Sequence, residues 1–344
     1  MKEEKIAEYI TEWLRDYLRG SGSRGYVVGV SGGVDSALVS TLCARTGAPL
    51  WCLTLPIHQA SSHVSRAQEQ CAFLTGRYDN VRTQEVDLTG AFDVLAQVLP
   101  RSGNREKDDM ALANTRSRLR MTALYQAAAV NGALVAGTGN KIEDFGVGFF
   151  TKWGDGGVDL SPIGDLTKTQ VYALAAFLGV PRSILEAEPS DGLFENDRTD
   201  QMQIGATYPE LEWAMDRVNE GRSAADFEGR QAEVMRIYAA RHAANAHKMN
   251  PISVCKIPED FCGAERITDT TEKGLAFRQA LSRFYGFGDT PSPLQGGKFS
   301  CGRFERSCLS RRGGSGDGQQ GWVSSRMAFR HFSSSSSSQD MAAR

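Results

Sequence analysis

The segment Ser31-Gly32-Gly33-Val34-Asp35-Ser36 holds the residue types best suited to chemistry in this chain. The apolar run 26–30 before it predicts a buried strand, and the apolar residues 37–42 after it predict a helix. Glycines between a strand and a helix let the backbone approach an anion closely. The free N–H groups and the dipole of the helix N-terminus also favour negative charge. The segment therefore predicts a phosphate-binding loop.

Asp35 is the unexpected residue of this loop, because a carboxylate repels a neighbouring phosphate. It fits if a divalent cation lies between the two groups, since Mg²⁺ is commonly held by one or two carboxylates together with phosphate oxygens. Ser31 and Ser36 add hydroxyl donors. The loop matches neither the Walker A pattern nor the G-x-G-x-x-G pattern. The structural alternative is an ordinary strand–turn–helix connection in which Asp35 caps the helix.

Two further stretches contain candidate functional residues. Lys168 lies at the start of a helix predicted over residues 166–178. A lysine in the first helical turn opposes the helix dipole, so binding of an anion would explain its position, whereas an exposed lysine would need no explanation. Residues 137–159 are dense in glycine and charge and follow a predicted strand, so we expect them to form part of a site.

The elements that position these residues predict an α/β fold. We expect strands at residues 26–30, 50–55, 81–86 and 132–136, and further helices at 3–19, 61–74, 91–99, 110–130, 208–218 and 224–246. This alternation is typical of a doubly wound parallel sheet with helices on both faces. Functional loops should lie beyond the carboxyl ends of its strands. Residues 101–109 and 195–207 are polar and are expected to be loops.

Composition and charge argue against several classes of protein. The 344 residues have a formal net charge of −2, with 41% hydrophobic and 23% charged residues, which is typical of a globular protein and indicates neither a nucleic-acid partner nor a membrane partner. No apolar run approaches the ~20 residues that span a bilayer. The seven cysteines form no C-x-x-C pair and the N-terminus does not resemble a signal peptide. We therefore expect reduced thiols, a cytoplasmic location and no zinc.

The last part of the chain differs from the rest. Residues 286–344 hold 13 serines and 10 glycines, too few apolar residues to offset the entropy of ordering. We expect one domain at residues 1–260, followed by a low-complexity tail at 261–344 that is disordered or an aberrant gene end. Basic and aromatic residues in the tail leave nucleic-acid binding as the alternative.

The S-G-G-x-D-S pattern resembles the pyrophosphate loop of the N-type ATP pyrophosphatases, which include NAD, GMP and asparagine synthetases. Within that superfamily, the chain resembles the NAD synthetases over about residues 1–260. The segments that carry this narrower resemblance are residues 137–168, N-T-R-S-R-L-R-M at 114–121, E-P-S-D-G-L at 188–193 and H-K at 247–248. The resemblance implies an adenine-nucleotide alpha-hydrolase-like fold.

The resemblance also implies the last reaction of NAD biosynthesis. The nicotinate carboxylate of deamido-NAD attacks the α-phosphate of ATP, which releases pyrophosphate, and ammonia then displaces AMP to give NAD. Mg²⁺ is the implied cofactor, ATP the co-substrate and a homodimer the implied assembly. Glutamine-dependent members carry a nitrilase-like domain before the synthetase, and only 25 residues precede the first predicted strand. We therefore expect free ammonia as the nitrogen donor, unless a separate glutaminase subunit supplies it.

Individual residues acquire roles from the same resemblance. Asp35 and Glu143 are the implied metal ligands. The residues implied to bind ATP are Gly29, Ser31, Gly32, Gly33, Val34, Asp35, Ser36, Thr138, Thr151, Lys168 and Ser190. Those implied to bind deamido-NAD are Asn114, Arg118, Arg120, Lys152, Asp155, Asp159, His247 and Lys248. The expected catalytic residues are Lys168, which neutralises charge on the leaving group, and Asp155, which orients ammonia or accepts its proton.

Two other interpretations remain open. Another member of the superfamily would adenylate a different substrate, as GMP synthetases and tRNA-modifying enzymes do. A non-enzymatic module would only bind adenine nucleotide, although that binding alone does not require the two carboxylates Asp35 and Glu143. Asn140 and Lys141 stand where some NAD synthetases have Asp-His, so the resemblance assigns them no role.

Overall fold

The structure is a computed structural model that describes residues 1–190, 192–193, 199–258 and 261. The chain divides into two units, Met1–Lys256 and Ile257–Arg344, and every residue of the candidate site belongs to the first. The expected tail lies outside the described residues except for Phe261, so its order stays a prediction. None of the described helices is both long enough and apolar enough to cross a membrane.

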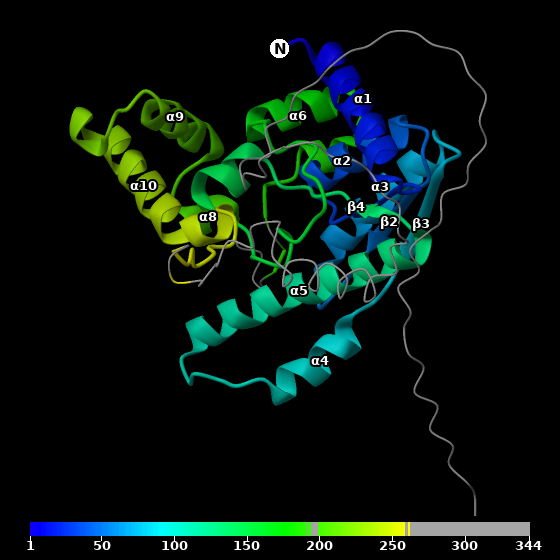
Figure 1. Ribbon diagram of the computed structural model, residues 1–344, viewed down its shortest axis with the longest axis horizontal. Helices are drawn as coiled ribbons and strands as arrows, with labels where there is room; N and C mark the ends of the chain where they lie inside the picture. The colour runs from blue at the N-terminus through cyan, green and yellow to red at the C-terminus, as the bar shows by residue number, and fades with distance from the viewer. Residues whose placement is uncertain (191, 194–198, 259–260, 262–344) are drawn as a thin grey trace, which may run out of the picture. The chain divides into compact units, whose positions relative to one another are not determined.

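A parallel sheet of four strands lies at the centre of the first unit (Figure 1), with the order β3-β2-β1-β4. The strands are β1 Tyr26–Gly29, β2 Leu50–Thr54, β3 Val81–Glu85 and β4 Leu134–Val135. Tyr26 of β1 pairs with Leu50 on one side and with Leu134 on the other. The chain adds β2 and β3 on one side of β1 and then crosses to the opposite side for β4. The carboxyl ends of β1 and β4 are therefore the point at which ligands bind in such sheets.

Both faces of the sheet are covered by helices, as predicted. Tyr26 and Val28 point into one core and Val27 into the other, which is the alternation expected of a strand. The first core contains residues of α1 Glu3–Ser21, α2 Val34–Arg45, α3 Ser61–Thr75, α6 Lys168–Phe177 and α7 Arg182–Leu185. The second core is closed by α5 Arg105–Asn131, against which α4 Thr89–Val98 packs.

A third core lies among the C-terminal helices, which are grouped together in Figure 1. Ile142 and Val147 pack there against Ile204, Leu211 and Met235. The elements involved are the π-helix η1 Lys141–Val147, α8 Asp200–Ile204, α9 Tyr208–Asn219, the short 3₁₀ helix η2 Ala224–Asp226 and α10 Gly229–Met249. The segment that follows β4 is therefore held by helices far away in the sequence.

Three expected elements differ in the structure. The polar stretch 101–109 is not all loop, because Asn104 caps α5 by accepting a hydrogen bond from the Lys107 N–H, and α5 begins at Arg105. Residues 200–204 form α8 where a loop was expected, with Thr199 as its cap. The helix expected at 224–246 is divided, since α10 begins only at Gly229.

Glu210 joins the start of α9 to α10. Its carboxylate accepts a hydrogen bond from the Thr207 N–H at 2.8 Å, which completes a capping box. Arg230 of α10 donates to both of its oxygens, at 2.8 and 2.9 Å. Chiefly because of Arg230, the pKa of Glu210 is lowered to about 2.

We expect Glu210→Gln to lower the free energy of unfolding by about 1 kcal/mol at pH 7, after allowance for the exposure of Arg230 to solvent. Glutamine preserves the capping box, so the loss reports the charge pair. A lowered carboxyl pKa stabilises the fold above the ordinary pKa of the group, so the difference from wild type should disappear as the pH falls toward 2.

Urea unfolding from pH 7 downward measures this difference. Glu233→Gln is the control, because Glu233 also pairs with Arg230, at 3.1 Å, but caps no helix and is 55% exposed. A loss of unfolding free energy for Glu210→Gln that does not change with pH would show that the charge pair between Glu210 and Arg230 is not its cause.

Candidate active site

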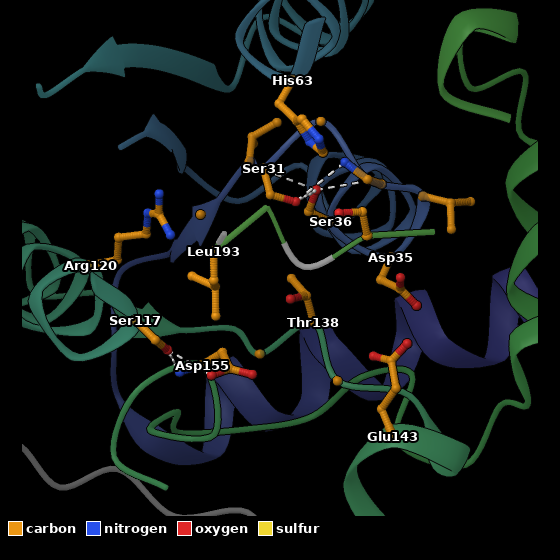
Figure 2. Close-up of a pocket in the computed structure, with 18 of the residues that line it drawn as sticks. Ser31, Asp35, Ser36, His63, Ser117, Arg120, Thr138, Glu143, Asp155 and Leu193 are labelled. Atoms are coloured by element: carbon orange, nitrogen blue, oxygen red, sulfur yellow. Dashed lines mark hydrogen bonds between the residues drawn. The ribbon is translucent and has the colours of Figure 1, made fainter. Parts of the chain in front are cut away.

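A cavity of about 250 Å³ opens at the carboxyl ends of β1 and β4. Its lining includes the loop after β1, residues 137–139 after β4 and residues of α3, α5 and α6. Glu143 and Asp144 of η1 and residues of the later loops also line it. Figure 2 shows residues of these segments around the cavity. The cavity therefore lies where the reversal of strand order predicts a ligand.

The loop after β1 has the backbone that a phosphate-binding loop requires. Gly32 has φ +87°, and a Cβ at this position would lie 2.5 Å from the carbonyl oxygen of His63 in α3, so only glycine fits. The hydroxyls of Ser31 and Ser36 lie 3.1 Å apart, and Ser31 Oγ accepts a hydrogen bond from the Gly33 N–H. The two hydroxyls therefore order the loop itself.

Asp35 does not cap the helix. The N-cap of α2 is Gly33, and no side chain caps this helix end. The Asp35 carboxylate instead accepts hydrogen bonds from Lys168 Nζ at 2.5 Å and from Asn140 Nδ2 at 3.0 Å. The structural alternative stated for Asp35 is therefore wrong, and its side chain is directed into the candidate site.

Lys168 joins three segments that are distant in the sequence. Its Nζ atom lies 2.5 Å from Asp35 Oδ2 and 2.9 Å from Glu143 Oε1, and the residue is only 4% exposed. Thr167 caps α6 with a capping box, so Lys168 begins the helix. Two carboxylates of the protein, Asp35 and Glu143, therefore explain why a lysine lies in the first turn of α6. Figure 2 shows Asp35 and Glu143 directed toward each other.

Attraction between the charges of this cluster opposes the cost of burying them. Burial alone would lower the pKa of Lys168, but the two carboxylates raise it above its ordinary value, so the ammonium stays protonated. Burial acts to raise the pKa of Glu143, yet Lys168 and the hydroxyl of Tyr208 bring it below its ordinary value. The pKa of Asp35 is raised by burial, against the effect of Lys168.

Asn140 binds the Asp35 carboxylate and the backbone N–H of Glu143, and it was missed by the sequence analysis. Its Nδ2 donates to Asp35, while its Oδ1 accepts from the N–H groups of Ile142 and Glu143, each at 3.1 Å. Asn140 therefore caps η1 and links it to α2. Asparagine is a common N-cap residue, and this preference is the signal in the sequence that could have marked Asn140.

The donor set fits Mg²⁺ bound together with phosphates. Among the described residues, no group of three or more His, Cys, Asp or Glu side chains could hold a metal ion by itself. Asp35 and Glu143 supply two carboxylates, both 16% exposed, beside the loop after β1. Mg²⁺ is usually held in this way, by one or two carboxylates with substrate phosphates and water.

Most of the residues expected to bind ATP line the cavity. They are Gly29, Ser31, Gly32, Gly33, Val34, Asp35, Ser36, Thr138, Lys168 and Ser190. Thr151 is not among the lining residues, because it is 5% exposed and donates to Asn114 Oδ1 at 2.6 Å. The binding role of Thr151 stays a prediction.

Asp155 lines the same cavity and is held rigidly. Its Oδ1 accepts hydrogen bonds from Ser117 Oγ at 2.7 Å and from the Thr151 N–H at 2.9 Å. Ser117 Oγ also accepts from the Asp155 N–H. Burial raises the pKa of Asp155 above its ordinary value. A carboxylate that gains a proton more readily than usual is suited to accept one.

The residues expected to bind deamido-NAD do not all lie together. Arg120 lines the cavity and donates to Leu55 O and to Gln59 Oε1. Asp159 lies outside the lining and accepts from the Val135 N–H and from the Tyr125 hydroxyl, so it fixes the end of β4.

The other expected deamido-NAD residues join the loop after η1 to neighbouring helices. Arg118 donates to the carbonyl of Lys152, and Lys152 donates to the carbonyl of His247 at 2.5 Å. Lys248 donates to the carbonyls of Gly148 and Phe150, at 2.6 and 2.8 Å. These side chains and Asn114 do not line the cavity, and their role in binding substrate stays a prediction.

Two residues of α3 also line the cavity and were missed. His63 and Arg66 face the loop after β1, and Arg66 Nε donates to Gly32 O at 3.2 Å. The guanidinium adds positive charge beside the loop after β1. No motif marks these positions in the sequence, because they belong to one face of an ordinary helix.

We expect Lys168→Met to lower the free energy of unfolding by about 3 to 5 kcal/mol at pH 8, because it leaves two buried carboxylates without a cation. The loss should be smaller at pH 5, since the carboxylates of the variant can then bind protons. Lys141→Met is the matched control, because Lys141 pairs with Asp165, which is 96% exposed, and should cost less than about 1 kcal/mol. Urea unfolding at both pH values measures these losses. Equal losses for the two variants would show that the buried pairs of Lys168 contribute no more to stability than an exposed pair does.

Comparisons with known proteins agree with this geometry. The family model described as NAD synthase matches residues 6–251. An NH(3)-dependent NAD(+) synthetase of Carboxydothermus hydrogenoformans is 41% identical over 61% of this chain and 84% of that protein. The Archaeoglobus fulgidus protein of the same name is 38% identical over 70% of this chain and 94% of its own length.

Solved structures give the same result. The NMN synthetase of Francisella tularensis superposes with a TM-score of 0.63 at 28% identity, covering 75% of this chain and 99% of that one. The NH3-dependent NAD synthetase of Campylobacter jejuni superposes with a TM-score of 0.60 at 25% identity, covering 74% of this chain and 100% of that one. The chain thus belongs to the NAD synthase family.

Proposed function

We propose that this chain catalyses the ATP-dependent amidation of deamido-NAD to NAD with ammonia, releasing AMP and pyrophosphate. The observation that carries the proposal is the cluster of Lys168, Asp35 and Glu143 beside a phosphate-binding loop, in a chain of the NAD synthase family. The protein is therefore a ligase that forms a C–N bond. Membership of this family argues against a GMP synthetase or a tRNA-modifying enzyme, and the paired carboxylates argue against a module that only binds nucleotide.

The first half of the reaction joins deamido-NAD to the α-phosphate of ATP. The N–H groups at the start of α2, with the Arg66 guanidinium nearby, bind the phosphates of ATP. Asp35 and Glu143 hold Mg²⁺, which when bound offsets negative charge on those phosphates. Lys168 is protonated and buried, so it stabilises the charge that develops on the departing pyrophosphate.

The second half replaces AMP by ammonia. Ammonia attacks the carbonyl carbon of the adenylate, AMP departs, and the new amide loses a proton. Asp155 accepts that proton, since it lines the cavity and its raised pKa favours the protonated product. Among the described residues, the hydrogen bonds that hold Asp155 reach Oδ1, which leaves Oδ2 to receive the proton. Arg120 and the residues of the loop after η1 bind deamido-NAD.

A second candidate substrate follows from one comparison. The Francisella tularensis neighbour is named an NMN synthetase, so its product carries a single nucleotide. Amidation of nicotinic acid mononucleotide uses the same chemistry on a substrate that lacks the adenylate half of deamido-NAD. The curated relatives named NAD synthetases favour the dinucleotide as the substrate of this chain.

We also propose that the enzyme is a homodimer that works in the cytoplasm. Apolar side chains are exposed on α4 and at the start of α5, with Val94 64%, Val98 75% and Met110 49% exposed. Helices α4 and α5 lie side by side in Figure 1, and a second copy of the chain would cover them. The described cysteines are free thiols, which supports a reducing compartment. Free ammonia is the nitrogen donor, whether taken from solution or released by a separate glutaminase.

We expect the purified chain to form NAD from deamido-NAD, ATP and Mg²⁺ with ammonium but not with glutamine, and to release AMP and pyrophosphate in equal amounts. The measurement is NAD by chromatography, with nicotinic acid mononucleotide offered as the competing substrate. Asp35→Ala is the negative control and should abolish turnover. Faster amidation of the mononucleotide would favour the second candidate, and no amide from either substrate would overturn the proposal.

Val98→Glu should convert the dimer to a monomer, because it places a charge in the apolar contact. The matched control is Val130→Glu, since Val130 is 72% exposed and lies at the other end of α5. Light scattering after gel filtration measures the mass of each variant. A wild-type monomer at micromolar concentration, or a dimer that survives Val98→Glu alone, would contradict the assembly.

A further inference from the structure

Tyr208 connects the core of C-terminal helices to the candidate active site. It begins α9 and packs in the same core as Leu211. Its hydroxyl lies 2.5 Å from Glu143 Oε1 and 2.7 Å from Asp200 Oδ2. Tyr208 is 9% exposed and Asp200 is 5% exposed, so these contacts are shielded from water. A side chain without an expected role therefore contacts one of the two proposed metal ligands.

The backbone alone does not determine where the Glu143 carboxylate points. Asn140 binds the Glu143 N–H and so places the start of η1, but the glutamate side chain has three rotatable bonds beyond its Cα atom. Two groups converge on Glu143 Oε1, namely the Lys168 ammonium and the Tyr208 hydroxyl. Lys168 also binds Asp35, so it draws the two carboxylates together. Tyr208 contacts the same oxygen from α9, independently of α2 and α6.

The tyrosine ring is well suited to this task. It is rigid beyond two rotatable bonds, and neighbours in the C-terminal core hold it in place. Lys168 Nζ lies 4.8 Å from the ring centroid, a favourable contact between a cation and an aromatic face. The hydroxyl has a single proton, which is donated to Glu143, and Asp200 Oδ2 lies 2.7 Å away on the polar end of the ring.

We propose that Tyr208 is a positioning residue, which holds the Glu143 carboxylate in the orientation that binds Mg²⁺ together with ATP. The proposal rests on the function proposed above, because it takes Glu143 to be a metal ligand. Groups that hold a ligating carboxylate by hydrogen bonds commonly contribute 10- to 100-fold to metal affinity or activity.

Tyr208→Phe tests the hydroxyl alone, because phenylalanine keeps the ring, its packing and its contact with Lys168. The matched control is Tyr238→Phe. Tyr238 lies in the same core and is 3% exposed, and among the described residues its hydroxyl makes no hydrogen bond. Glu143→Gln serves as the reference for loss of the metal ligand itself.

The measurement is ATP binding by calorimetry, with Mg²⁺ and again with EDTA, in the absence of deamido-NAD. We expect Tyr208→Phe to raise the Kd for ATP about 10-fold in Mg²⁺ and to leave the Kd in EDTA unchanged. Glu143→Gln should behave in the same way, with an equal or larger loss. Tyr238→Phe should change neither value, and the two tyrosine variants should melt at similar temperatures.

Three outcomes would overturn the proposal. In the first, Tyr208→Phe binds ATP as the wild type does in Mg²⁺. In the second, it weakens binding equally in Mg²⁺ and in EDTA, which is the result of a merely structural role. In the third, Glu143→Gln itself leaves Mg²⁺-dependent binding of ATP unchanged, which would show that Glu143 is not a metal ligand and that Tyr208 has no ligand to position. NAD formation by the same wild-type preparation separates these failures from a failure of the proposed function.

Discussion

The buried ammonium of Lys168 is the interaction on which the site depends. It binds Asp35 from the start of α2 and Glu143 from the segment after β4, and it comes itself from the start of α6. Two carboxylates could not remain charged so close together and so far from water without a cation between them. The parallel sheet brings the three segments to one edge, and the ion pairs then hold them there. The loop after β1 thereby acquires two acidic neighbours, Asp35 from α2 and Glu143 from η1.

The fold follows from the sequence where the signals are local. The apolar runs at β1 and β2 are buried on both faces of the sheet, so each is readable as a strand without knowledge of its partners. The loop after β1 is equally readable, because Gly32 needs a positive φ and a close approach to α3. Lys168 was marked by its conflict with the helix dipole. That conflict predicts an anion near Lys168, and two carboxylates lie there. The helix dipole does not distinguish a carboxylate of the protein from the phosphate of a ligand.

The rest of the site depends on contacts between distant elements. Tyr208 contacts Glu143 because η1 packs against helices more than 50 residues away in the sequence. Asn140 contacts Asp35 because β4 and β1, which precede them, are neighbours in the sheet. Arg66 faces the cavity because of the way in which α3 crosses the sheet, and its own helix carries no sign of this. The stretch 200–204 reads as a polar loop, yet Thr199 caps it and the third core buries Ile204. Tertiary packing determines these contacts and the helix at 200–204, and the periodicity of a single segment contains no information about it.

The placement of η1 has a consequence for local stability. Asp35 belongs to an element of the sheet core, whereas Glu143 belongs to a segment whose apolar residues lie in the C-terminal core. Proteins open in cooperative parts. If the C-terminal helices, which have a core of their own, open as one such part, the sheet stays intact. Such an opening would remove Glu143 and leave the loop after β1 in place. A ligand that needs both carboxylates binds only the closed form, so by mass action it makes the opening rarer. Hydrogen exchange in α9 and α10 should therefore slow, although neither helix lines the cavity.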